Sequence, residues 1–245
     1  CPTRRTHGQG VAGAVAQTGG RMRRRMLKRE TEAERIQRLF TGRDGRFRFA
    51  RWAQPLAPAV FNADGYGAKM MREALGGVAK LGGLWLAESD PRIGANVYVF
   101  FCDCWDEARE AAARRTPPSA DLCQLAPRLF GVDADCHRAF GFDASGAIRL
   151  CALFIRDDAE SQRLKAQTTA AFEALRAILL WSEDAFAEGP PVDIIAAEER
   201  ATISQWHADL VLAAYDPSIP AASTDPAQAD RIAARMRALR EARRW

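Results

Sequence analysis

The sequence predicts an α+β fold, in which a mixed, largely antiparallel sheet of about four to six strands packs against several helices. Residues Ala95–Trp105 form a run that is apolar on both alternating faces, as expected of a central strand covered on both sides. Residues 138–156 have the pattern of a β-hairpin, and residues 159–181 place apolar side chains at helical spacing. With 245 residues, 48% of them hydrophobic, the chain can bury a sizeable core.

The first helix is expected over Glu32–Phe40. Thr31 and Glu34 have the spacing of a capping box, in which each side chain accepts a backbone N–H of the other residue. The glycines of Thr41–Gly45 predict a turn. Arg46–Trp52 then alternates between charged and aromatic or small residues, which predicts a strand with one face exposed to solvent.

A longer helix is expected to begin at Asn62 or Asp64, since either side chain can cap its first turn. Residues 59–61 just before it are a short strand or the lead into this helix. Gly82 and Gly83 end the helix, and residues 84–88 follow as another predicted strand. The apolar face of the helix would comprise Tyr66, Met70, Ala74, Val78 and Leu81.

After the central strand, Asp103 is placed to cap a helix that extends to about Arg115, and Ala120–Phe130 is predicted as a second, shorter helix. The hairpin that follows turns at residues 143–146, where Gly146 suits a positive φ angle.

Three helices are expected in the last third of the chain. The longest covers residues 159–181 and should pack on the sheet. Asp225 followed by Pro226 predicts the start of an arginine-rich helix that continues to the end of the sequence. Between them lies an amphipathic helix with apolar positions at Ile203, Trp206, Leu210, Val211 and Ala214.

Charge is distributed unevenly along the chain. The net charge is +4, but residues 1–29 contain eight of the 35 basic residues and none of the 31 acidic ones, which leaves the rest of the chain at −4. We therefore expect residues 1–25 to be a disordered basic tail or a non-native leader, residues 26–222 to be a single α+β domain, and residues 223–245 to be a C-terminal arginine-rich helix.

The sharpest candidate for chemistry is the cysteine pair at the end of the central strand. Cys104 would lie at a helix N-terminus, where backbone N–H groups stabilise a thiolate. Together with Cys136 and His137, Cys102 and Cys104 contain the ligand types of a four-coordinate zinc site. The C-x-C and C-H spacings are not the usual zinc spacing, however, and cysteine is also a common small core residue, so buried or idle thiols are the preferred interpretation.

No other catalytic pattern occurs in the sequence. It contains neither an H-E-x-x-H zinc motif nor a G-x-S-x-G nucleophile turn. His207 is expected to be a partly exposed helical residue, and the pairs Glu183-Asp184 and Glu198-Glu199 are interpreted as solvated positions at helix ends. No residue is assigned a catalytic role, and no cofactor is expected.

Four segments together resemble proteins of unassigned activity from Rhodobacter-type alphaproteobacteria. More remotely, a Gly-x-Asn strand, a long helix and a late helix ending in Tyr-Asp-Pro are similar to a proteobacterial family of zincin-like proteins of unknown function. This resemblance implies that Phe172–Trp181 occupies the position of the protease metal helix. That segment contains no histidine, so metalloprotease activity is not implied. The four segments are Arg46–Trp52, Gly94–Phe101, Leu179–Asp184 and Ala213–Pro220.

The leading functional hypothesis is a non-catalytic, cytoplasmic α+β domain that acts through interaction with a protein partner. One alternative is a thiol-dependent or metal-binding protein centred on Cys102 and Cys104. Another is nucleic-acid binding through the basic termini, although a nucleic-acid partner is not expected. No membrane partner is expected, because no run of 18 apolar residues is present.

Overall fold

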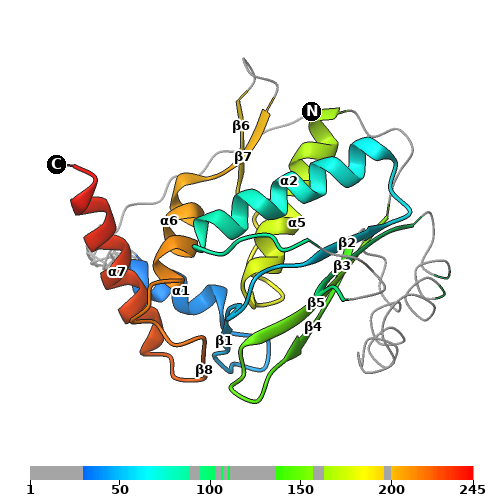
Figure 1. The fold of residues 1–245 in the computed structure, drawn as a ribbon. Helices are drawn as coiled ribbons and strands as arrows, with labels where there is room; N and C mark the ends of the chain where they lie inside the picture. The colour runs from blue at the N-terminus through cyan, green and yellow to red at the C-terminus, as the bar shows by residue number, and fades with distance from the viewer. Residues whose placement is uncertain are drawn as a thin grey trace, which may run out of the picture. The chain divides into compact units, whose positions relative to one another are not determined.

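The largest sheet of the computed structural model has four strands in the order β2-β3-β5-β4 (Figure 1). β3 pairs in parallel with both β2 and β5, and β4 pairs antiparallel with β5. The predicted α+β class and a mixed sheet of four strands are confirmed, with the antiparallel pairing of this sheet confined to the β4–β5 hairpin. The strands are β2 Pro58–Phe61, β3 Val97–Cys102, β4 Cys136–Phe142 and β5 Ile148–Arg156.

The structure describes residues 30–88, 94–102, 106, 110, 136–156, 163–195 and 200–244. Residues Thr31–Trp245 belong to one unit of the chain. The predicted basic tail, the predicted cap at Asp103 and the short helix expected over Ala120–Phe130 lie outside the described residues.

Two helices pack against the same face of the sheet. They are α2, Gly65–Leu81, which connects the parallel strands β2 and β3, and α5, Arg163–Ile178, which follows β5 (Figure 1). Leu75 of α2 and Leu175 of α5 are fully buried in one hydrophobic cluster with Val99 and Leu153 of the sheet. This burial explains why residues 163–178 form a helix despite the weak amphipathic pattern of their alanine-rich sequence.

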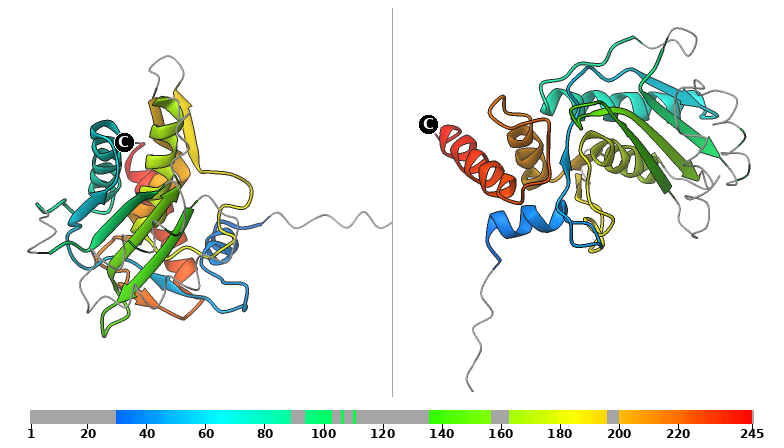
Figure 2. Two further views of the ribbon diagram at one scale, coloured as in Figure 1. Left: turned by 90° about the vertical axis from the view of Figure 1, so that its right-hand side faces the viewer. Right: turned by 90° about the horizontal axis from the view of Figure 1, so that it is seen from below.

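A second group of helices lies beyond this layer. It comprises α1, Glu32–Leu39, α6, Gln205–Ala214, and α7, Gln228–Ala242. α7 contacts both α1 and α6, and Figure 2 shows the three helices together in red, blue and orange. α7 therefore belongs to the same unit as the sheet.

Short strands complete the described elements. β1, Phe49–Ala50, pairs antiparallel with β8, Ala222–Ser223. β6, Val192–Ile195, pairs antiparallel with β7, Arg200–Ile203. Among the described residues, no helix combines the length and apolar character that a bilayer span requires.

The other face of the sheet contains a second hydrophobic cluster. The rings of Phe61, Phe100 and Phe154 stack across three adjacent parallel strands, with centroids 5.0 and 5.2 Å apart. Phe100 is fully buried, and Val99, which faces the helices, is fully buried as well. The expectation that the central strand is covered on both sides is therefore confirmed.

Local patterns predicted most element boundaries closely. The capping box is present, since Glu34 N donates to Thr31 Oγ1 (3.2 Å) and Thr31 N donates to Glu34 Oε2 (2.8 Å). Gly146 has φ 83° in the hairpin turn. The buried face of α2, in contrast, is rotated by about one residue from the expected one and comprises Met71, Leu75, Val78 and Ala79.

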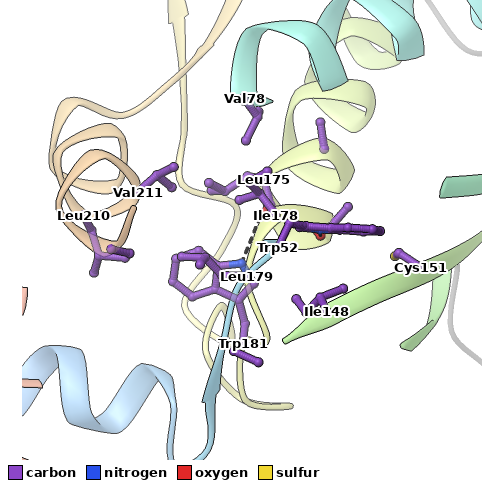
Figure 3. Close-up of a cluster of buried hydrophobic side chains, with 14 of the residues drawn as sticks. Trp52, Val78, Ile148, Cys151, Leu175, Ile178, Leu179, Trp181, Leu210 and Val211 are labelled. Carbon is purple, nitrogen blue, oxygen red and sulfur yellow. Dashed lines mark hydrogen bonds between the residues drawn. The ribbon is translucent and has the colours of Figure 1, made fainter. Parts of the chain in front are cut away.

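Trp52 lies in the segment that follows the turn at residues 41–45 and enters the core. Its indole is fully buried, and its Nε1 donates to the carbonyl of Ala177 (2.8 Å). Its backbone N–H donates to the Tyr215 hydroxyl (3.1 Å), which donates in turn to the carbonyl of Ile178 (2.8 Å). Figure 3 shows Trp52 among side chains of α2, α5, α6 and β5. The predicted strand over residues 46–52 forms as the two-residue strand β1 with isolated bridges at Phe47, Arg51 and Trp52, rather than as one regular strand.

Replacing Trp52 with phenylalanine should destabilise the fold strongly. The Trp52→Phe variant removes the hydrogen bond to Ala177 and leaves unfilled volume in the core, so we expect the free energy of unfolding to fall by about 2–4 kcal/mol in urea titrations. Trp85→Phe is the matched control, because Trp85 is 66% exposed, and it should change the value by less than about 0.5 kcal/mol. Equal losses in the two variants would contradict a central role for Trp52.

Candidate functional site

The α5-facing side of strand β4 presents a charged residue followed by aromatic ones. Arg138 lies opposite Leu153 and Phe140 lies opposite Cys151 in the β4–β5 ladder, and both partners belong to the cluster covered by the helices. Phe142 follows at the end of the strand, with its ring 6.5 Å from that of Phe140 and its side chain 41% exposed. β4 is the last strand of the sheet, so this row runs along an edge.

A buried ion pair lies on α5. Arg176 Nη1 is 2.7 Å from Glu173 Oε1, and the Glu173 side chain is only 3% exposed. The Arg176 guanidinium also lies 5.0 Å from the ring centroid of Phe172. The arginine compensates for the burial of the carboxylate, and the three residues occupy neighbouring positions on successive turns of the helix.

Cys151 of β5 lies near both the ion pair and Arg138 of β4. Burial raises the pKa of the Cys151 thiol to about 12, while the charge of Arg138 lowers it and that of Glu173 raises it. Both charged groups are therefore close enough to act on the same thiol. We call Arg138, Cys151, Glu173 and Arg176 the β4–α5 cluster.

The β4–α5 cluster combines a protonated thiol, a carboxylate bound to an arginine, and guanidinium groups. A thiol with this pKa stays protonated at neutral pH and is a poor nucleophile. The Glu173 carboxylate already binds Arg176. Within the described ranges, no group of three or more His, Cys, Asp or Glu side chains is arranged to hold a metal ion. Guanidinium groups, in contrast, are strong donors to carboxylates.

Two of the predicted zinc ligands, Cys102 and His137, lie on strands that are separated by β5. Cys102 is buried at the end of β3, where its thiol donates to the Ile155 carbonyl (3.4 Å), and it pairs with Arg156 of β5. His137 pairs with Phe154 on the opposite side of β5. Since β5 separates the two, their Cα atoms are about 10 Å apart or more.

The two remaining candidate ligands are less fully described. Cys136 is the first residue of β4, and Cys104 lies outside the described residues. The four-residue zinc site, with Cys102 and His137 as its other members, therefore stays a prediction.

The sequence did not indicate Glu173 as a buried acid. Its neighbours one turn away, Ala170 and Ala177, are buried against the sheet, but alanines carry little weight in an apolar pattern. The apolar pattern expected over residues 159–181 did not include this glutamate, so it was assigned no role. Only the packing of α5 on the sheet shows that this position is interior.

Two of the four arginines of α7, and Arg243 directly after it, form ion pairs within the fold. Arg240 contacts both Glu32 (2.7 Å) and Asp209 (2.8 Å), and Arg243 contacts Asp209 (2.7 Å). Arg235 pairs with Asp216. These ion pairs attach α7 to α1, α6 and the turn after α6, which leaves these three arginines poorly placed to bind nucleic-acid phosphates.

His207 was expected to be partly exposed, but it is buried, with only 8% of its surface exposed. It lies between aromatic side chains of α6 and of residues 181–186. Its Nδ1 lies 2.7 Å from Ser204 Oγ. Burial, and then the charge of Arg35, lower the pKa of His207 to about 4. The imidazole is therefore neutral at physiological pH, which fits a packing role.

Acidification should destabilise the fold through His207. Between pH 6.5 and about 4 the unfolded chain binds a proton that the folded protein does not, so stability falls as the pH falls through this range. We expect the free energy of unfolding to drop by roughly 2 kcal/mol between pH 7 and pH 5 from this group. Urea titrations of wild type and His207→Gln should show a smaller drop in the variant, and an unchanged drop would contradict the assignment.

The thiols of Cys102 and Cys151 should resist alkylation in the folded protein. Both are buried, and the raised pKa of Cys151 leaves almost no thiolate to react. We expect iodoacetamide at pH 8 to leave both peptides unmodified in mass spectrometry, whereas the same peptides should label fully in urea. Rapid labelling of Cys151 under native conditions would contradict this description of the β4–α5 cluster.

No protein-family model, curated protein or solved structure matches this chain. The interpretation of the site therefore depends on its own residues. These are an arginine and two phenylalanines along an edge strand, beside a buried ion pair and a protonated thiol.

Proposed function

We propose that this domain is a non-catalytic interaction domain that binds an extended peptide along the outer edge of β4. The observation that carries the proposal is the position of β4. It is the end strand of the sheet, and none of the described strands pairs with its other side. Half of the N–H and C=O groups of an edge strand point away from the sheet, and an added strand can pair with them.

The side chains of β4 favour a specific ligand rather than general adhesion. Arg138, Phe140 and Phe142 follow one another along the α5-facing side, with a shift of register between Gly141 and Phe142, so a bound peptide would meet one cation and two aromatic rings. Aromatic and arginine side chains are the ones most enriched at energetically important positions of interfaces. Main-chain pairing would supply affinity, and these side chains would supply selectivity.

The zincin resemblance is compatible with this proposal. If α5 occupies the position of the protease metal helix, Phe172 and Arg176 flank Glu173 where an H-E-x-x-H helix has its two histidines. Arg176 binds the carboxylate that would otherwise act as general base. Such a helix suits a scaffold that retains peptide binding without peptide cleavage.

A display selection tests the proposal directly. The full chain would be immobilised and used to select from a library of random twelve-residue peptides. We expect enriched peptides that slow hydrogen exchange of the β4 amides. Phe142→Ser should weaken their binding at least about tenfold, because it removes a partly exposed ring from the proposed contact.

Ile194→Ser is the matched control. Ile194 is 54% exposed on the β6–β7 hairpin and belongs to no part of the proposed site, so binding should be unchanged. Peptides that protect β6 or α7 instead of β4, or that bind Phe142→Ser as tightly as wild type, would overturn the proposal.

A further inference from the structure

Arg138 differs from other partly buried arginines of the described chain. Its Nε and Nη1 atoms are shielded from solvent and have no hydrogen-bond partner. Arg51 and Arg176 also have a shielded Nε without a hydrogen bond, but Arg51 donates to two backbone carbonyls through its other nitrogens. Arg176 and Arg240 bind carboxylates. No ion pair joins Arg138 to any residue that the structure describes.

An unpaired guanidinium at this depth is costly. Buried charges in proteins are normally paired, and a guanidinium cannot avoid the cost by losing its proton. The carboxylate of the β4–α5 cluster is that of Glu173, whose Oε1 binds Arg176, and no described hydrogen bond or ion pair joins it to Arg138. Arg138 is therefore a strong donor without an acceptor, placed on the strand that we propose as the peptide-binding edge.

We infer that Arg138 binds a carboxylate group of the ligand. The carboxylate is either an aspartate or glutamate side chain or the C-terminus of the peptide, since both offer the same two oxygens to a guanidinium. The inference rests on the proposed function in one respect, namely that a peptide presents the carboxylate. The anion site itself is testable without a peptide.

The open part of the guanidinium is consistent with this role. Nη2 is not among the shielded nitrogens, so it is the part of the guanidinium that a ligand carboxylate would meet first. The aromatic rings of Phe140 and Phe142 follow on the same side of β4, so the preferred ligand would combine an acidic group with apolar residues two and four positions away.

The first experiment uses acetate as the probe and nuclear magnetic resonance as the readout. Sodium acetate is titrated into the full chain against sodium chloride at equal ionic strength. We expect saturable acetate-specific shifts of the Arg138 side-chain Nε–H and of the Leu153 amide, and their loss in Arg138→Gln. Arg231→Gln, which removes an exposed arginine of α7, should keep them. Equal responses to acetate and chloride would overturn the inference.

A thermal measurement separates binding from a structural role. Because Arg138 lacks a partner, we expect Arg138→Gln to keep or raise the Tm, by up to about 4 °C. Acetate should raise the Tm of wild type and leave that of the variant unchanged. A variant that melts well below wild type, combined with no acetate effect on wild type, would assign Arg138 a structural role and overturn the inference.

The peptide arms identify the source of the carboxylate. Selected peptides are compared with versions in which each acid is replaced by its amide and with versions amidated at the C-terminus. We expect one of these changes to weaken binding to wild type at least about tenfold and to have little effect on Arg138→Gln.

The two proposals fail separately. Peptides that bind along β4 without preference for an acid, together with no acetate response, would remove the carboxylate site and leave the proposed function standing. Acetate binding at Arg138, together with a failure to find any peptide that protects β4, would remove the proposed function and leave the carboxylate site standing.

Discussion

The burial of Trp52 is the contact on which the arrangement of the other elements depends. Its indole bonds to the end of α5, and its backbone bonds to Tyr215 at the end of α6. Neighbouring backbone groups pair with the start of β5 and with the segment after α5. The packing around Tyr215 is close, since a Cβ atom at Gly82 would lie 3.0 Å from its ring. The glycine that ends α2 is therefore required by the same contact.

The core around Trp52 explains why the fold tolerates the polar groups of the β4–α5 cluster, which lie next to the core at the edge of the sheet. The Trp52 region and the stacked phenylalanines hold the sheet through apolar contacts. The β4–α5 cluster adds an ion pair, a protonated thiol and, at the sheet's last strand, an arginine that has no partner among the described residues. Groups that reduce stability without an evident structural return are commonly retained for binding. The position of the cluster agrees with that principle.

Much of the local structure could be predicted from the sequence, whereas the candidate site could not. The capping box of Thr31 and Glu34 and the turn at Gly146 involve residues within a few positions of each other, so their patterns are readable. The parallel pairing of β3 with β2 and β5 joins distant segments, and no local pattern encodes its register. Arg138 and Glu173 become neighbours of one thiol only when hairpin and helix pack together. Cys102 and Cys104, in contrast, are two residues apart, so the sequence alone could indicate them as a candidate site.

The ion pair between Arg240 and Glu32 joins the last described helix to the first. Helices α1 and α7 are separated by most of the chain, and this ion pair holds them in contact. A pulling force applied at α1 and α7 would load this contact before it reached the sheet. The α1–α7 contact would thus open before the core around Trp52 is disturbed.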